Sequence, residues 1–295
     1  MTTATLGFIG IGVMGLPMAK NLARSGARLA VWNRSSERAR LIESPKVEIA
    51  SGPSDVFKTC RVIILMLANS EAMDEVMQRG EAEFAEMVRG RIIVNMGTTS
   101  PEYSAGLEEA IRTCGGQYVE APVSGSRAPA EAGQLVAMLA GDTSAVDEVA
   151  PLLQPMCKQT VNCGAVPSAL LMKLSVNLFL ITMVTGLCES FHFAERNGLD
   201  LAKFGEILDA GPMASAVSKM KLAKLIGQDF SVQASIVDVQ KNSRLIVEAA
   251  RSAAIATRVM DDCNDLFSEA LKGGFGSLDM VGVLRAMEAG SEGQG

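Results

Sequence analysis

Short apolar runs alternate with helical patterns along the first part of the chain. Each run is bounded by Gly, Pro, Asn or Ser, which is typical of buried strands. The runs are Thr5–Ile9, Arg28–Trp32, Val62–Met66, Arg91–Asn95, Gln117–Glu120, Gln134–Leu139 and Gln159–Asn162. Strands that alternate with helices predict an α/β fold, a Rossmann-type, mostly parallel sheet with helices on both faces.

From about residue 165 the strand pattern disappears and only helical spacing remains. Pro167 is well placed to begin a long helix, 167–196, which Asn197 and Gly198 would end. Further helices are expected at Leu201–Ala210, Ala214–Ile226, Ser235–Arg251, Ala256–Leu271 and Asp279–Met287. The sequence therefore predicts two domains, a sheet domain over 1–164 and an all-helical domain over 165–295.

The apolar segments do not indicate a membrane protein. The run Leu174–Cys188 includes polar side chains and is shorter than the roughly 20 apolar residues that a bilayer helix needs. The segment Met1–Leu6 lacks the basic region of a signal peptide. We expect a cytoplasmic location and no membrane partner.

Charge and the rarity of histidine exclude several function classes. Lys and Arg number 27 against 33 Asp and Glu, a net charge of −6, which argues against a nucleic-acid partner and favours small molecules. The single histidine, His192, is interpreted as a packed or surface helix residue, and the cysteines show no metal-ligand spacing. No metal is therefore expected, and the thiols should be reduced and mostly buried. Five basic residues could help to attract an acidic substrate, but the favoured interpretation is that they are exposed charges: Arg127, Lys219, Lys221, Lys224 and Arg244.

A glycine-rich turn follows the first predicted strand. Gly10, Gly12 and Gly15 form the pattern G-x-G-x-x-G between that strand and a helix. The first glycine makes the tight turn, the second admits a pyrophosphate to the backbone, and the third lets helix and strand pack closely. The helix N-terminus adds free N–H groups and a partial positive charge. We predict a dinucleotide site here, which also includes Val13 and Met14.

The tip of the second strand favours NADP(H). An acid at this position would bind the ribose 2′-hydroxyl of NAD, but the chain has Asn33, Arg34 and Ser35 there and no acid until Glu37. A guanidinium and a hydroxyl suit a 2′-phosphate, which a carboxylate would repel. These three residues, with Leu67 after the third strand, are predicted to bind a cofactor that is preferably NADP(H), with NAD(H) possible. The alternative for Arg34 is an ordinary solvated residue.

Two loops carry candidate substrate groups. Thr98 follows the fourth predicted strand, and ligands of open α/β sheets bind at the carboxyl ends of the strands. Ser124 follows the fifth strand, between backbone N–H groups freed by Gly125 and a second hydroxyl, Ser126. This loop is suited to a carboxylate.

The long helix carries two further polar candidates. Lys173 and Asn177 are four residues apart, on one helix face, and could contact one ligand. When hydride reaches a carbonyl carbon, negative charge builds on the oxygen, so a nearby donor must stabilise and protonate it. Burial of Lys173 would lower its pKa toward neutrality. The alternative is a lysine that extends to solvent.

With these segments the chain resembles the β-hydroxyacid dehydrogenase family, relatives of 3-hydroxyisobutyrate and 6-phosphogluconate dehydrogenases. The stretch Glu120–Asp142 is most similar to the glyoxylate and succinic semialdehyde reductase branch, with E-A-P-V-S-G-S, then P-A-E, then G-Q-L. The resemblance implies that Lys173 is the essential acid/base and that Asn177 orients the substrate. It also implies that Ser124 and Thr98 hold the substrate or the nicotinamide.

The resemblance adds Lys241 and shows two departures. Lys241 matches the lysine of a K-D-x-x-L pattern near the cofactor. The family's next acid is Asn242 here, and a glycine ahead of the catalytic helix is Pro167. These departures concern the identity of the substrate more than the reaction class.

The sequence thus predicts an NADPH-preferring reductase of small acidic carbonyl compounds, such as glyoxylate or succinic semialdehyde, that yields hydroxy acids. The resemblance implies a homodimer or higher homo-oligomer formed through the helical domain. One alternative is oxidation of the 3-hydroxyisobutyrate type with NAD. Another is a non-catalytic dinucleotide sensor, which would need neither Lys173 nor Ser124. An imine reductase would carry a different residue in place of the lysine.

Overall fold

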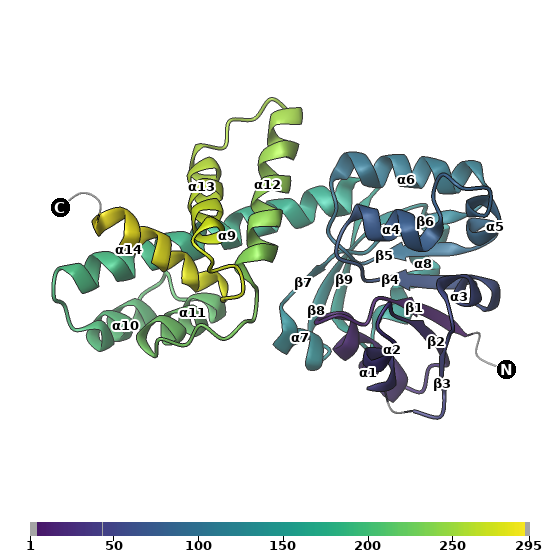
Figure 1. The fold of residues 1–295 in the computed structure, drawn as a ribbon, viewed down its shortest axis with the longest axis horizontal. Coiled ribbons are helices and arrows are strands. Elements are labelled where there is room, and N and C mark those ends of the chain that lie inside the picture. Colours follow the sequence, from purple (N-terminus) through teal and green to yellow (C-terminus); the bar gives the residue numbers. More distant parts are fainter. Residues whose placement is uncertain (1–4, 43, 293–295) are drawn as a thin grey trace. The chain divides into compact units, whose positions relative to one another are not determined.

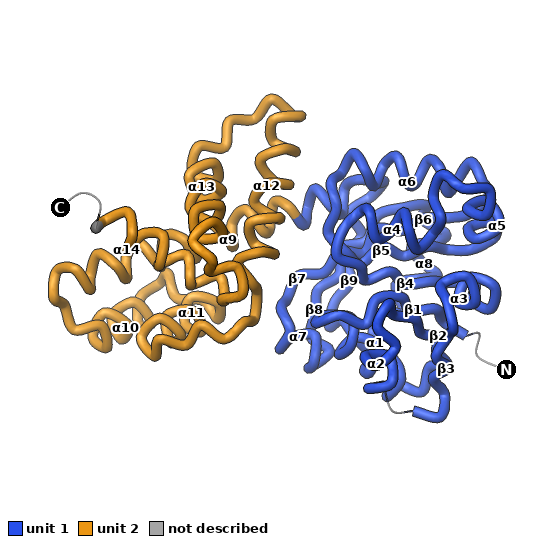
Figure 2. Tube along the Cα trace, in the orientation of Figure 1, with its two compact units in different colours: residues 1–173 blue, residues 174–295 orange. Residues whose placement is uncertain are grey.

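A computed structural model describes residues 5–42 and 44–292 of the chain. It divides into two compact units, 1–173 and 174–295, which Figure 2 shows in different colours. The predicted domain boundary precedes the long helix, whereas the structural division falls inside it. The reason is that the first turn of this helix packs on the sheet, where Ala169 joins a buried cluster with Met138 and Ala140.

The first unit contains a nine-stranded, mostly parallel sheet, which confirms the predicted fold class (Figure 1). The strands are β1 Leu6–Ile9, β2 Leu29–Trp32, β3 Val47–Ile49, β4 Val62–Leu65, β5 Ile92–Asn95, β6 Gln117–Glu120, β7 Val123–Ser124, β8 Leu135–Gly141 and β9 Cys157–Gly164. Their order is β3-β2-β1-β4-β5-β6-β8-β7, with β9 paired to β8. Pairing is parallel from β3 to β6, β8 is antiparallel to β6 and β7, and β9 is parallel to β8. Every predicted strand is present, and β3 and β7 were not predicted.

Helices cover both faces of this sheet. They are α1 Gly15–Arg24, α2 Ser36–Arg40, α3 Pro53–Thr59, α4 Ser70–Met77, α5 Phe84–Val88, α6 Pro101–Thr113, α7 Arg127–Glu131 and α8 Thr143–Val149, followed by a 3₁₀ turn, Ala150–Leu153. Alternate strand residues face opposite sides: Ile64 packs in a core with residues of α1 and α8, and Ile63 and Leu65 pack in another with residues of α3 to α6. Each fully buried side chain of this kind stabilises the fold by about 1.5–3 kcal/mol.

The second unit is built from helices that share one core. They are α9 Ser168–Arg196, which begins in the first unit, then α10 Leu201–Ala210, α11 Ala216–Ile226, α12 Ile236–Ser252, α13 Arg258–Lys272, a 3₁₀ turn Met280–Val283, and α14 Leu284–Glu292. Side-chain caps define several starts. Asp200 accepts the N–H groups of Ala202 and Lys203, and Ser215 forms a capping box with Ser218.

Helix α9 has 29 residues and, by length and composition alone, could cross a bilayer. The apolar run Leu174–Cys188 therefore covered only part of this helix, and its length did not rule out a membrane-spanning one. Buried apolar side chains of its later turns, among them Val184 and Phe191, belong to the core of the helical unit. The core helix of a globular domain passes the same test of length and composition.

The expectation that Lys221 and Lys224 are exposed charges is wrong. Lys221 Nζ lies 2.7 Å from Oδ1 and 3.0 Å from Oδ2 of Asp279, and both side chains are buried. Lys224 Nζ donates to Asp229 at 2.8 Å and to Ser231 at 3.0 Å. Helical spacing did not separate these lysines from solvated ones, because neither acidic partner lies on the same helix: Asp279 is 58 residues from Lys221, and Asp229 lies in the turn after α11.

The cysteines and the histidine occupy structural positions. All six cysteines are free thiols, and four of them are buried: Cys60, Cys157, Cys188 and Cys263. This agrees with the prediction of reduced, mostly buried thiols. His192 lies on α9 with Nε2 3.0 Å from Oγ of Ser291.

Candidate active site

The glycine turn between β1 and α1 has the geometry that a pyrophosphate requires. Gly10 has φ +101°, and a Cβ there would lie 2.2 Å from the carbonyl oxygen of Met66; a Cβ on Gly15 would lie 1.9 Å from the carbonyl oxygen of Gly10. Around Gly12, by contrast, a Cβ would meet no described atom within 4 Å, so the backbone is open to a ligand. Helix α1 has no acidic residue in its first turn and no side-chain cap on Met14. The residues present therefore fit a dinucleotide phosphate.

The predicted 2′-phosphate residues lie at the tip of β2. Asn33 Oδ1 accepts the N–H of Ile11 at 2.8 Å, and its amide donates to the carbonyl of Ser35 at 2.9 Å. Asn33 thus connects the strand tip to the glycine turn. Arg34 and Ser35 are exposed, and the Ser35 hydroxyl makes no capping bond to α2.

Leu67 and Gly97 bring two further loops to the same edge of the sheet. A Cβ on Gly10 would approach the Leu67 side chain to 3.1 Å, and a Cβ on Gly97 would approach the Leu67 carbonyl oxygen to 2.9 Å. The loops after β1, β4 and β5 are therefore in contact, and Thr98 follows directly in the last of them. Its neighbour Thr99 was not predicted; its buried Oγ1 has no hydrogen-bond partner among the described residues.

The predicted carboxylate loop begins where β7 ends. Ser124 is half-buried. Gly125 has φ +122°, and a Cβ there would lie only 2.8 Å from the Leu135 side chain, too close for an ordinary contact. Glycine is therefore required at this turn. Ser126 precedes α7 without capping it through its side chain.

Lys173 and Asn177 occupy buried positions one turn apart on α9, at 9% and 6% exposure. Burial lowers the pKa of Lys173 to about 8, because the interior disfavours its charged form. The alternative of a solvent-exposed lysine is therefore wrong. A buried amine with a pKa near neutrality can both donate and accept a proton.

The remaining predicted residue, Lys241, lies on α12 in the helical unit, where it is half-buried. The adjacent Asn242 donates to the carbonyl of Asp238 at 2.7 Å, and its buried Oδ1 has no partner among the described residues.

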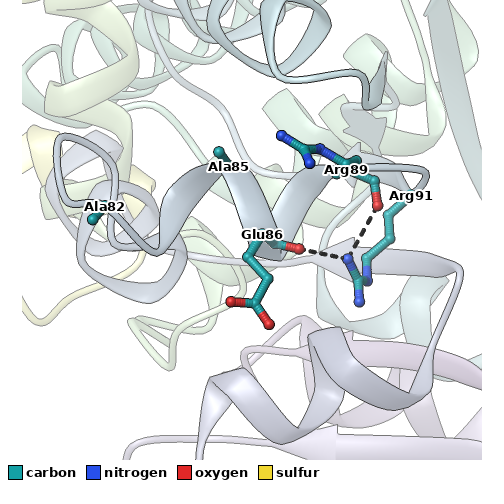
Figure 3. Close-up of a pocket in the computed structure, with 5 residues that line it drawn as sticks. All are labelled: Ala82, Ala85, Glu86, Arg89 and Arg91. Carbon is teal, nitrogen blue, oxygen red and sulfur yellow. Dashed lines mark hydrogen bonds between the residues drawn. The ribbon is translucent and has the colours of Figure 1, made fainter.

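A pocket of ≈ 520 Å³, drawn in Figure 3, includes none of these residues in its lining. It is lined by Ala82, Ala85, Glu86, Arg89 and Arg91. Arg91 directly precedes β5, so this pocket is at the amino end of the strands, whereas ligands of open α/β sheets bind at the carboxyl end. The Arg91 guanidinium donates to the carbonyls of Glu86 and Arg89 at 2.8 and 3.1 Å, as Figure 3 shows. Those bonds give Arg91 a structural role.

Comparisons with known proteins agree with this geometry. A family model described as the NAD binding domain of 6-phosphogluconate dehydrogenase matches residues 5–164. A second, described as NAD-binding of NADP-dependent 3-hydroxyisobutyrate dehydrogenase, matches residues 168–287.

Curated relatives cover the chain almost end to end. The chain is 31% identical to glyoxylate/succinic semialdehyde reductase 1 of Arabidopsis thaliana over 97% of this chain and 99% of that protein. It is 26% identical to 2-hydroxy-3-oxopropionate reductase of Escherichia coli strain K12, over 96% and 97% of the two chains. Mycobacterium tuberculosis 3-hydroxyisobutyrate dehydrogenase, solved with L-serine, has the same fold, with a TM-score of 0.84 at 20% identity over 97% and 99% of the two chains.

The fold and the glycine turn define an NAD(P)-dependent oxidoreductase, a dehydrogenase or reductase with a Rossmann-type domain followed by a helical one. The full-length similarity then makes the assignment specific. The chain belongs to the β-hydroxyacid dehydrogenase family.

Proposed function

We propose that the chain is an NADPH-preferring reductase of small semialdehyde or keto acids and that Lys173 is its general acid. The observation that carries the proposal is the burial of Lys173, which brings its pKa to about 8 on the helix that follows the sheet domain. The reductases that resemble the chain act on glyoxylate, succinic semialdehyde or 2-hydroxy-3-oxopropionate by name, which supports the substrate class.

Each site residue has a separate role in the reduction of the carbonyl group. Bound NADPH supplies the hydride that adds to the carbonyl carbon. The Lys173 ammonium donates one proton to the carbonyl oxygen, so that an alcohol forms and the amine is left neutral. Ser124 and the backbone at Gly125 bind the substrate carboxylate, while Thr98 and Asn177 orient the reacting end. In the oxidation direction the neutral amine takes the proton back.

The cofactor preference rests on the exposed guanidinium at the tip of β2. Arg34 is available to a 2′-phosphate, and no acid occupies the three positions that follow Trp32. One of the matching family models describes an NADP-dependent enzyme, which supports the preference, with NAD(H) possible. We expect Arg34→Gln to lower the ratio of kcat/KM for NADPH to that for NADH about tenfold. Arg28→Gln, at the other end of β2, is the matched control and should leave the ratio unchanged.

The proposal extends to assembly and location. A second copy of the chain is the expected partner, bound through the helical unit as a homodimer or higher homo-oligomer. We propose a cytoplasmic location.

The decisive experiment follows NADPH and NADH absorbance against glyoxylate, succinic semialdehyde and 2-hydroxy-3-oxopropionate. Lys173→Ala should lower kcat about 10²-fold or more and leave the Kd of NADPH nearly unchanged. Lys203→Ala, an exposed lysine of α10, is the matched control. Full activity of Lys173→Ala would refute the assignment, and tight NADPH binding without turnover of any of these acids would favour the non-catalytic sensor.

A further inference from the structure

A buried chain of hydrogen bonds runs from the loop after β5 toward the start of α9. The N–H of Gly97 donates to Oδ1 of Asn95 at 2.9 Å. The Asn95 amide donates to Oη of Tyr118 at 2.9 Å, and this oxygen lies 2.8 Å from Oγ of Ser104. The three side chains are all buried, so the bonds are protected from water.

This chain of hydrogen bonds ends on the carboxylate of Glu120, the last residue of β6, which is completely buried. Ser104 Oγ donates to Oε1 at 2.6 Å. The N–H groups of Ala169 and Leu170 donate to Oε2 at 3.1 and 3.2 Å. First-turn N–H groups of a helix have no partner within the helix, so Glu120 caps α9 from the sheet.

One arrangement of protons gives every donor and acceptor in this chain of hydrogen bonds a partner. Because Gly97 donates to Oδ1 of Asn95, the amide nitrogen faces Tyr118. Ser104 gives its only proton to the carboxylate, so Tyr118 must donate to Ser104. An ionised Glu120 accepts three hydrogen bonds and needs to donate none. Burial raises the pKa of Glu120, and these hydrogen bonds act in the opposite direction.

We propose that Glu120 is a positioning residue for Lys173, an inference that rests on the proposed function. Lys173 follows Ala169 by four residues and therefore lies one turn further on the same helix face. By capping the first turn of α9, Glu120 holds that turn against the end of β6 and so sets the position of Lys173 relative to the sheet.

The first test is independent of activity. Glu120→Gln keeps the side-chain shape but places a donor where an acceptor is needed. We expect amide hydrogen exchange at Ala169 and Leu170 to become about tenfold faster, with exchange in α1 unchanged. Unchanged exchange at these two amides would overturn the anchoring role.

Two further variants complete this test. Tyr118→Phe interrupts the chain without touching the carboxylate and should accelerate the same amides by a smaller factor. It also replaces Glu120→Gln in both experiments if that variant fails to fold. Glu109→Gln removes an exposed carboxylate from the helix that carries Ser104, and exchange at the start of α9 should stay as it is.

The second test is a double-mutant cycle on turnover with NADPH. Glu120→Gln should lower kcat about 10- to 100-fold, with the Kd of NADPH unchanged. In a Lys173→Ala background the same substitution should cause no further loss, since a residue that acts only by positioning the lysine has nothing left to position. Equal losses in both backgrounds would show a general structural role and reject the proposal. If Lys173→Ala alone is fully active, the proposed function fails while the exchange result still stands.

Discussion

Single residues of the glycine turn separate cofactor binding from stability. A methyl group on Gly12 would meet no described atom within 4 Å, so Gly12→Ala should leave the melting temperature within about 2 °C of the parent. The methyl would nevertheless stand where the pyrophosphate approaches the backbone, and we expect the Kd of NADPH to rise at least about tenfold. Fluorescence titration with NADPH and thermal unfolding measure the two quantities.

The control for this variant is the same substitution in open space elsewhere. Gly52 precedes α3 and is equally unobstructed, so Gly52→Ala should preserve both stability and NADPH binding. Gly10→Ala should unfold the turn, because its Cβ would collide with the Met66 carbonyl. Unimpaired NADPH binding by Gly12→Ala would contradict the placement of the phosphates.

The proposed acid gives the reaction a pH dependence of predictable sign. Because burial brings the pKa of Lys173 to about 8, the ammonium is the main form at pH 7. Reduction consumes this proton, so kcat/KM for reduction should be flat below pH 7 and fall about tenfold per pH unit above about pH 8. Oxidation of the hydroxy acid needs the neutral amine and should rise over the same range. A reduction rate that stays constant to pH 10 would exclude Lys173 as the proton donor.

At the scale of elements, the buried ammonium of Lys173 on helix α9 lowers the stability of the folded state. The pKa of Lys173 is about 8 in the folded chain against 10.5 for a free lysine, so the unfolded state binds more protons between these values. Stability therefore rises with pH across this window, and the full cost, on the order of 3 kcal/mol, applies below it. Lys173→Met should raise the melting temperature by several degrees at pH 7 and by little near pH 10.5. The exposed Lys203→Met should show no such pH-dependent gain, and a Lys173→Met variant that melts lower than the parent at pH 7 would contradict this cost.

The strands that the sequence predicted have at least four residues each, and the two that it missed are shorter. Strands β1 and β4, and β5 up to its last residue Asn95, are buried on both faces and form unbroken apolar runs. Strand β3, Val47–Ile49, is short and largely exposed at the sheet edge, and β7 has two residues, so neither produces a pattern. Such strands depend on their neighbours for pairing.

The same distinction holds within the candidate site. The glycine turn and Lys173 were predictable because each belongs to a local motif. Glu120 was visible only as one letter of the E-A-P-V-S-G-S stretch, since its partner Ala169 is 49 residues away along the chain. Contacts at that separation are set by the tertiary fold, and no spacing rule within a helix or strand reports them.

At the scale of the whole molecule, the exposed aromatic side chains of α9 are where we expect the proposed dimer to form. Phe179 and Phe193 are 69% and 68% exposed, and each is about two turns from Gly186, where a Cβ would meet no described atom within 4 Å. Two such helices crossing antiparallel at Gly186 would bring Phe179 of each copy onto Phe193 of the other, an isologous contact with a close approach at its centre. We therefore expect a dimer or a higher oligomer of dimers at micromolar concentration by light scattering.

Charge substitutions on this surface test the arrangement itself. The double variant Phe179→Glu with Phe193→Glu should dissociate, because like charges would then meet across the two-fold axis. Phe179→Glu with Phe193→Lys should associate again, since each glutamate would face a lysine. Ile207→Glu, at an equally exposed apolar position on α10, should leave the assembly intact. A parent chain that scatters as a monomer, or a Glu–Lys variant no more associated than the Glu–Glu variant, would reject this pairing.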